Sequence, residues 1–279
     1  MKKNESSISL KKIQKIELGI LKYLNDICLK NDITYFLAYG SLIGAIRHGG
    51  FIPWDDDIDV MMFREDFYKL IEALNKYPFS YYKLVSYETN SRFTAPLPKI
   101  IDTRTKLIQN YDYHERVSLG VYVDIFILDG VGNTSLEAKR RYRKSIELYR
   151  KWRFSDLRVF PPHHSKIYGL LRYAKYLPNN IFGISYRLNK LKEFGEEKKV
   201  SESLYVSTFG TGSESVERNI WLKSDFLPTQ RISFENLQLS IPRNYDKILR
   251  CEYGDYMKIP PVDKRKSHHT YTLGWRDNL

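Results

Sequence analysis

The feature that most constrains this chain is a short apolar run near residue 60 in which two aspartates alternate with buried residues. Asp57 and Asp59 are separated by Ile58 and followed by Val60. Successive side chains of a strand point to opposite faces, so the two aspartates share one face while the apolar residues enter the core. Two carboxylates this close repel each other unless a cation neutralises both. The pattern predicts a site for Mg²⁺, or for Mn²⁺, because both cations prefer carboxylate oxygens.

The segment just upstream predicts a phosphate-binding turn. Residues 33–38 are apolar and aromatic, which is typical of a buried strand, and they run into Gly40-Ser41 and a short helix over 42–47. Backbone amides at the start of a helix can receive a phosphate oxygen, and Ser41 adds a hydroxyl donor. The alternative for the acidic run 55–57 is a solvated turn that caps the next element.

Periodicity along the rest of the chain indicates an α+β fold. Helical spacing covers 8–30, 64–77 and 135–153, and strand patterns cover 81–87, 97–109 and 121–128, the last ended by a turn at Asp129-Gly130. These elements predict a mixed sheet core flanked by helices, with a basic helical insertion. The expected organisation is a core over 1–132, a basic helical region facing the acceptor or a membrane over 133–200, and a C-terminal segment over 201–279 that completes the active site.

The net charge of +12 is unevenly placed. Between Lys139 and Lys199 there are 17 Lys and Arg but 5 Asp and Glu, so this segment carries the whole excess. Basic and aromatic residues alternate within it, which suits an anionic membrane surface, a polyanionic acceptor or nucleic acid. The alternative is a solvated helix face. No apolar run reaches the roughly 18 residues that cross a bilayer, and no signal peptide is recognised, so the expected location is cytoplasmic, at most peripheral at the inner face of the membrane.

The order strand, Gly-Ser turn, helix and Asp-hydrophobic-Asp strand resembles the nucleotidyltransferase superfamily. That superfamily places a third carboxylate on a later strand between hydrophobic residues, and Asp124 lies between Val123 and Ile125. The resemblance implies that Asp57, Asp59 and Asp124 are catalytic and hold the metal. Asp124 would bind a second metal or accept the proton of an attacking hydroxyl. Alternatively, Asp124 is a buried acid paired with an arginine such as Arg104.

Longer stretches resemble the LicD family more specifically. They are residues 38–48, 50–60, 98–105, 123–130 and 253–257, with Pro260-Pro261. The likeness spans about 15–270 and is densest over 38–63. It implies a nucleotidyltransferase-like fold related to the fukutin group. It also implies a Mg²⁺-dependent transfer of phosphocholine from CDP-choline to a sugar hydroxyl of teichoic acid, lipopolysaccharide or capsule, releasing CMP.

Further side chains are candidates for substrate binding. Arg47 and His48 end the short helix that begins near Ser41, where a cation reaches the donor phosphates, although a helix-end role is the alternative. Lys99 and Arg104 flank Asp102 as phosphate or carboxylate partners, or as members of a structural salt bridge.

Choline recognition would require an aromatic box around a quaternary ammonium. Trp54, Tyr39 and the tyrosines of 253–257 are candidates. Alternative activities are transfer of ribitol phosphate, glycerol phosphate or phosphoethanolamine from a CDP-linked donor, or transfer of the nucleotide itself. The acceptor would be a glycan or a lipid-linked glycan. Nucleic acid is not expected as a partner, because no helix-turn-helix, zinc-finger or RNA-stacking signature accompanies the basic segment.

Overall fold

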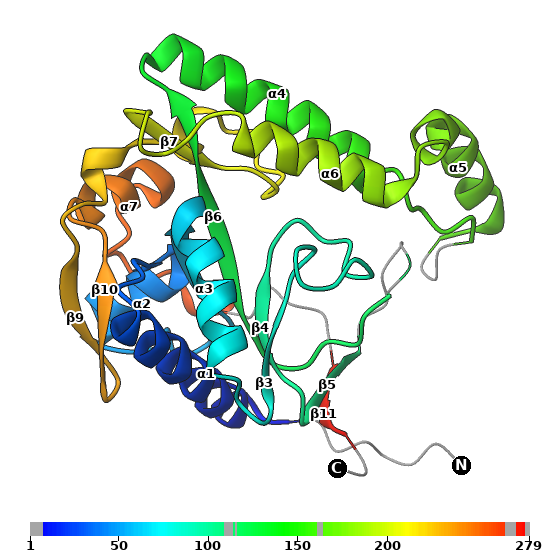
Figure 1. Cartoon of the computed structure of the whole chain (residues 1–279). Helices are drawn as coiled ribbons and strands as arrows, with labels where there is room; N and C mark the ends of the chain where they lie inside the picture. The colour runs from blue at the N-terminus through cyan, green and yellow to red at the C-terminus, as the bar shows by residue number, and fades with distance from the viewer. Residues whose placement is uncertain (1–7, 109–113, 115, 161–163, 266–271, 277–279) are drawn as a thin grey trace.

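One long strand, β6 (Tyr122–Gly132), organises a mixed sheet (Figure 1). The computed structural model describes residues 8–108, 114, 116–160, 164–265 and 272–276. The main path of the sheet has the order β1-β2-β6-β4-β3, with β1 at Phe36–Leu37, β2 at Ile58–Phe63, β4 at Lys99–Asp102 and β3 at Tyr82–Val85. Strand β2 is parallel to β6, and the other pairs are antiparallel. The predicted α+β class with a mixed sheet is confirmed.

Later parts of the chain extend the same sheet. Strand β7 (Tyr205–Thr208) pairs with the distal end of β6, and β8 (Ile220–Leu222) pairs with β7. Strand β11 (Thr272–Trp275) pairs with β5 (Thr105–Ile108) in a separate two-stranded sheet, and the amide of Ile8 donates to the carbonyl of Leu273 over 2.9 Å. The beginning and the end of the described chain therefore meet beside β5.

The two faces of β2 have different partners. Ile58, Val60 and Met62 enter a core built with α1 (Leu10–Lys30) and α3 (Arg64–Lys76). Met61 and Phe63 point the other way, into a second core that contains Phe36, Phe226 and Trp221. Asp59 shares the parity of Met61, so its side chain lies on the face opposite α1 and α3.

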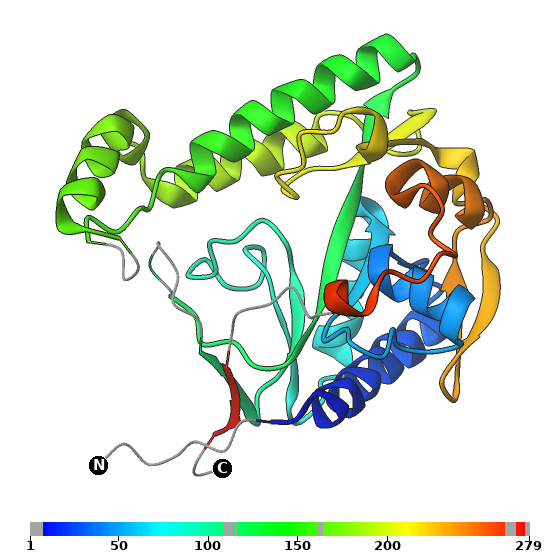
Figure 2. The same ribbon diagram turned by 180° about the vertical axis from the view of Figure 1, so that it is seen from behind.

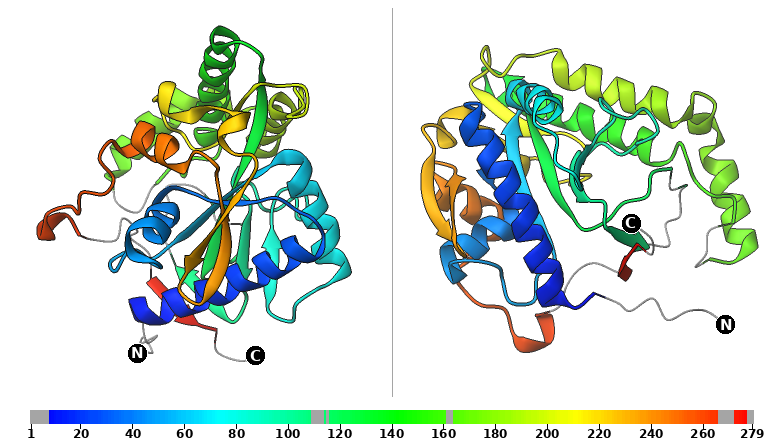
Figure 3. Two further views of the ribbon diagram at one scale, coloured as in Figure 1. Left: turned by 90° about the vertical axis from the view of Figure 1, so that its left-hand side faces the viewer. Right: turned by 60° about the horizontal axis from the view of Figure 1, so that its bottom comes forward.

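The remaining elements flank this arrangement. Helix α2 (Tyr39–His48) connects β1 to β2, and the hairpin of β9 (Gln230–Phe234) and β10 (Leu237–Ile241) runs beside it, near α7 (Tyr245–Tyr253) (Figure 3). Helices α4 (Ser135–Arg153) and α6 (Gly183–Glu196) pack side by side, and α5 (Lys166–Asn180) stands at their far end (Figures 1 and 2). Short 3₁₀ helices occur at Glu217–Asn219, Lys223–Asp225 and Val262–Lys264. None of the helices in the described part of the chain combines the length and apolarity that crossing a membrane demands.

Two sequence-based boundaries are wrong. The run 97–109 is not one strand, because the amide of Arg104 donates to Asp102 Oδ1 over 2.9 Å and turns the chain between β4 and β5. Asp129-Gly130 is not a turn but lies within β6. Asp129 is paired with Arg64, and a Cβ on Gly130 would lie 2.6 Å from the carbonyl of Lys199, so both residues serve contacts with distant segments.

Candidate active site

Strand register places three charged side chains in one row across the sheet. Asp59 of β2 lies opposite Asp124 of β6, and Asp124 lies opposite Lys99 of β4. Residues directly opposite one another in neighbouring strands point to the same face. Lys99 Nζ forms an ion pair with Asp124 Oδ1, with 14% of the lysine side chain and 13% of the aspartate side chain exposed. The sheet therefore presents two carboxylates and an ammonium at one level.

The charge on Asp59 is costly in this position. Burial raises the pKa of Asp59 well above its usual value, and the charges of Asp57 and Asp124 raise it further. The ammonium of Lys99 opposes this rise. A divalent cation would relieve the same repulsion, because an opposite charge favours the ionised carboxylates.

The loop before β2 gathers further carboxylates. Ligand oxygens of Asp55, Asp56 and Asp57 lie within 4.8 Å of one another, a grouping found among the described residues. A donor set made only of carboxylate oxygens fits Mg²⁺ or Mn²⁺. Of the three predicted ligands, this grouping contains Asp57 but neither Asp59 nor Asp124. Asp124 instead contacts Lys99 through Oδ1.

The Gly-Ser turn lies directly against this acidic loop. A Cβ on Gly40 would come within 2.9 Å of Asp55 Oδ2, so a larger residue would have to displace the Asp55 carboxylate. The amide of Asp59 donates to Ser41 Oγ over 2.8 Å, which fixes the start of β2 to the first turn of α2. Accepting this bond leaves the Ser41 proton able to donate to a substrate oxygen.

Tyr39 departs from ordinary backbone geometry at the same turn. Its φ is +46°, a left-handed conformation that is unusual for a bulky residue and is retained where the surroundings impose it. The ring packs edge-on against Phe126, with centroids 4.8 Å apart. Tyr39 thereby turns the chain from β1 into α2 and aims the N-terminus of α2 at the carboxylates. Its ring lies against Phe126 rather than against Trp54.

Arg47 and His48 connect α2 to the C-terminal segment. Arg47 Nη1 donates to the carbonyl of Tyr256 over 2.6 Å, and its Nε donates to His48 Nε2 over 3.0 Å. The rings of His48 and Trp54 meet edge to face at 6.1 Å, and the guanidinium of Arg265 lies 5.4 Å from the centroid of Trp54. Trp54 thus already faces a cation, and Tyr256 and Arg265 of the C-terminal segment contact Arg47 and Trp54.

Lys99 and Arg104 separate in space. Lys99 belongs to the row with Asp124, whereas Arg104 follows the opposite end of β4. Arg104 Nη2 is 2.6 Å from Oδ2 of the fully buried Asp102, and its guanidinium lies 3.5 Å from the centroid of Tyr81. The structure therefore pairs Asp124 with Lys99, not with Arg104, and gives Arg104 a structural ion pair.

A cavity of about 240 Å³ opens beside the row. Lys99 lines it together with Tyr149, Trp152 and Arg153 of the predicted basic and aromatic segment, and with residues that the sequence did not single out: Arg92, Arg116 and Asp156. Arg116 forms an ion pair with Asp156, and Trp152 Nε1 donates to the carbonyl of Thr94 over 2.8 Å. The lining also includes aliphatic side chains such as Leu97, Val117 and Leu119, so the cavity combines apolar, aromatic and basic surfaces, which suits a phosphate and a sugar or head group. The alternation of basic and aromatic residues in 140–153 was the sequence signal for its α4 side.

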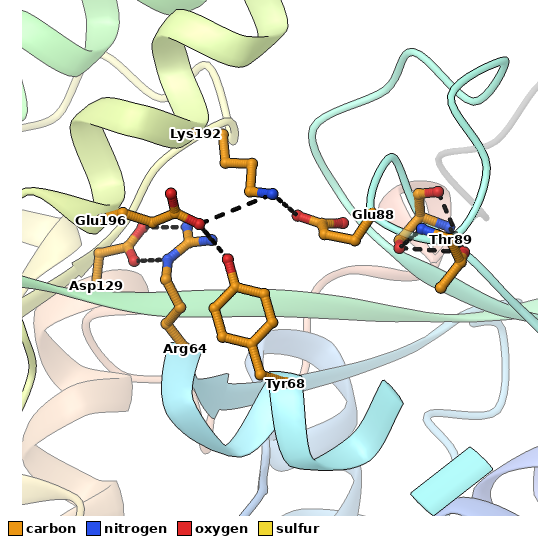
Figure 4. A network of polar contacts seen from close by, with 8 residues as sticks. Arg64, Tyr68, Glu88, Thr89, Asp129, Lys192 and Glu196 are labelled. Carbon is orange, nitrogen blue, oxygen red and sulfur yellow. Dashed lines mark hydrogen bonds and ion pairs between the residues drawn. The ribbon is translucent and has the colours of Figure 1, made fainter. Parts of the chain in front are cut away.

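A second group missed in the sequence connects the core to the basic helices. Arg64 at the start of α3 forms a bidentate pair with Asp129 of β6, and only 12% and 2% of these side chains are exposed (Figure 4). Tyr68 donates to Glu196 of α6, which lies 3.8 Å from Lys192. The buried site and the Glu196 contact raise the pKa of Tyr68 to about 12. The network fixes α6 to the sheet and supports the cavity wall.

Comparison with known proteins identifies the family. Residues 32–170 match the model of the nucleotidyltransferase domain of LicD, fukutin and fukutin-related protein, described as LicD/FKTN/FKRP. The lipopolysaccharide cholinephosphotransferase LicD of Haemophilus influenzae is 31% identical over 94% of this chain and 96% of its own length. The matched domain includes the whole row and the Gly-Ser turn.

Shorter matches fall on other proteins. An uncharacterised protein of Rickettsia prowazekii, RP689, is 26% identical over 51% of this chain and 48% of its own length. The human ribitol 5-phosphate transferase FKRP is 42% identical over 45 residues, 16% of this chain and 9% of FKRP. The near full-length similarity to the Haemophilus protein confirms the resemblance drawn from the motifs: this chain belongs to the LicD family of transferases.

Proposed function

We propose that this enzyme transfers phosphocholine from CDP-choline to a sugar hydroxyl of a cell-surface glycan and releases CMP. The observation that carries the proposal is the row of Asp59, Asp124 and Lys99 within a chain similar along nearly its whole length to a cholinephosphotransferase. Teichoic acid, lipopolysaccharide and capsule sugars are the acceptor classes.

The residues of the row and of the Gly-Ser turn have different roles in an in-line displacement at phosphorus. The acceptor oxygen bonds to the phosphorus that carries choline as the bond from that phosphorus to the CMP oxygen breaks. CMP leaves with the electron pair of that bond. Asp124, oriented by Lys99, accepts the proton of the acceptor hydroxyl. The amides at the start of α2 and the hydroxyl of Ser41 receive donor phosphate oxygens.

Asp57 and Asp59 would hold Mg²⁺. A bound divalent cation would neutralise the pyrophosphate charge that develops as CMP leaves. Two properties of the chain support this assignment: the raised pKa of Asp59, caused by burial and by Asp57 and Asp124, and the gathering of oxygens at Asp55, Asp56 and Asp57.

One observation supports an alternative donor, a CDP-linked polyol phosphate. The 45-residue match to a ribitol 5-phosphate transferase supports a polyol phosphate as cargo on the same catalytic core. Phosphoethanolamine and glycerol phosphate donors have the same CDP-linked chemistry. The candidate choline contact, Trp54, faces the guanidinium of Arg265, so choline would have to displace Arg265 or use the other face of the ring.

Donor choice is the decisive test. The purified enzyme is incubated with Mg²⁺, a short glycan acceptor and one of CDP-choline, CDP-ethanolamine, CDP-ribitol or CDP-glycerol. CMP release and the mass added to the acceptor are measured for each. We expect a phosphocholine mass increment and the highest kcat/KM with CDP-choline. A preference for CDP-ribitol would show that the transferred group is ribitol phosphate rather than phosphocholine. Addition of CMP to the acceptor would show that the enzyme is a nucleotidyltransferase.

Metal dependence is tested in the same assay. Chelation should abolish CMP release, and Mg²⁺ or Mn²⁺ should restore it. Full activity after chelation and gel filtration would overturn the metal assignment. Isothermal titration of the chelated protein with Mn²⁺ gives a readout without turnover, and Asp57→Asn should weaken that binding.

A further inference from the structure

Helix α5 exposes an unusually apolar face. Ile167, Leu170, Leu171, Ala174, Leu177 and Ile181 are all exposed, the large ones by 49% to 75%. Their spacing of three and four residues aligns them on one side of the helix, a pattern that normally faces a core. We call these six residues the α5 stripe. An exposed stripe of this kind marks an interaction surface.

The segment around the α5 stripe is cationic in sequence. Residues 157–192 contain seven Lys and Arg and no Asp or Glu, and α5 itself carries Lys166, Arg172 and Lys175. Cations of the neighbouring helices have acidic partners: Arg141, Lys144 and Arg150 of α4 and Lys190 of α6 lie within 2.9 Å of glutamate oxygens. Residues 157–181 add four Lys and Arg with no acidic residue among them, and three of the four belong to α5.

We propose that α5 docks the enzyme on an anionic lipid bilayer, with the α5 stripe in the interfacial layer and its lysines at the lipid phosphates. A helix with an apolar face and flanking cations has the composition of an in-plane membrane helix. Its 15 residues are fewer than the roughly 20 that a spanning helix needs. A second copy of the chain fits less well, because a two-fold contact would set the same cations against each other.

The position of α5 suggests what membrane docking would do for the reaction. This step of the inference rests on the proposed function. An open groove of about 670 Å³ is lined by Tyr173 of α5 and by Phe160, and it shares His114, Arg116 and Ile184 with the cavity beside Lys99. The groove beside α5 and the cavity that Lys99 lines therefore adjoin each other. A lipid-linked glycan held in the bilayer would enter along the groove toward Lys99.

Vesicle binding tests the docking without any turnover. The full chain is sedimented with vesicles of phosphatidylcholine alone or with about 30% phosphatidylglycerol. We expect binding to the anionic vesicles that weakens as salt is raised, and about tenfold weaker binding of Leu170→Ser/Leu171→Ser. The matched control is Leu136→Ser/Leu204→Ser, which alters two leucines that are equally exposed but lie outside α5. Circular dichroism melting establishes that each variant is folded.

Three outcomes would overturn the proposal. They are equal binding of wild type to neutral and anionic vesicles, equal loss of binding in the control variant, and a wild-type dimer that the α5 variant converts to a monomer. Asp59→Asn separates this inference from the proposed function, because it should bind vesicles as wild type does. A wrong donor assignment would leave every vesicle result unchanged.

Discussion

At the scale of the residue, Asp59 combines a cost to folding with a proposed role in the chemistry. We expect Asp59→Asn to lower kcat at least about a hundredfold, because an amide cannot supply the negative charge that the metal requires. In metal-free buffer the variant should melt no lower than wild type, since the raised pKa of Asp59 means that burial penalises the ionised carboxylate. Calorimetry and CMP release measure the two effects. Asp26→Asn, which changes an exposed residue of α1, is the control. Near-normal turnover of Asp59→Asn would show that Asp59 takes no part in the mechanism.

Glu17 is a second buried acid of this region, and it makes stability depend on pH. Its carboxyl is 2% exposed, its Oε2 lacks a hydrogen-bond partner among the described residues, and burial followed by the charge of Asp57 raises its pKa well above 4.5. The folded state therefore binds the proton more tightly than the unfolded state. The stability that this proton contributes is present below the unfolded pKa and is lost as pH rises through the folded pKa.

Glu17→Gln removes this dependence. Because glutamine does not ionise, the variant should gain stability relative to wild type as pH rises from about 5 to about 8 in metal-free buffer. Urea unfolding midpoints at both pH values measure the difference. Glu72→Gln, an exposed change on α3, should follow wild type at both values. A constant gap between wild type and Glu17→Gln across this range would contradict the assignment.

At the scale of the element, the Arg64–Asp129 pair joins α3, β6 and α6. Asp129→Asn should destabilise the fold by about 3–5 kcal/mol, because it leaves the Arg64 charge buried without its partner. Arg64→Met/Asp129→Leu should cost less than either single change, since no unpaired charge remains. Denaturant unfolding measures all variants. The exposed ion pair of Lys22 and Asp26 is the control, and Lys22→Ala is expected to lower the free energy of unfolding by about 0–1 kcal/mol. An equally small loss of stability in Asp129→Asn would contradict the prediction.

The same pair explains where sequence reasoning succeeded and failed for elements. The helix predicted over 135–153 matches α4, because its start signal is local: Thr134 Oγ accepts from the amide of Glu137 over 3.2 Å. Asp129-Gly130 gave an equally local turn signal, but Arg64 and Lys199 decide its structure from far away in the sequence. Likewise the partner of Asp124 depends on the register of β4 against β6, which no local pattern specifies.

At the scale of the whole molecule, the candidate active site is assembled from segments more than 200 residues apart. Strand alternation predicted one shared face for Asp57 and Asp59, but β2 begins at Ile58 and Asp57 lies in the loop before it. The motifs pointed to the C-terminal segment. The contact of Arg47 with the carbonyl of Tyr256 closes the two segments together. Such a contact needs the finished fold, because the C-terminal chain must first pass β10 and α7 before it reaches α2.

Arg47→Ala should therefore release the segment 254–265 from α2 while the sheet stays folded. We expect trypsin to cleave after Lys258, Lys264 or Arg265 about tenfold faster than in wild type, because proteolysis follows local opening. The cleavage products are identified by mass spectrometry, and the melting temperature monitors the rest of the fold. Lys83→Ala, an exposed change on β3, should leave the cleavage rate unchanged. If Arg47→Ala is cleaved at the wild-type rate, then Tyr256, whose hydroxyl donates to Asp246 over 2.8 Å, holds the segment without help from α2.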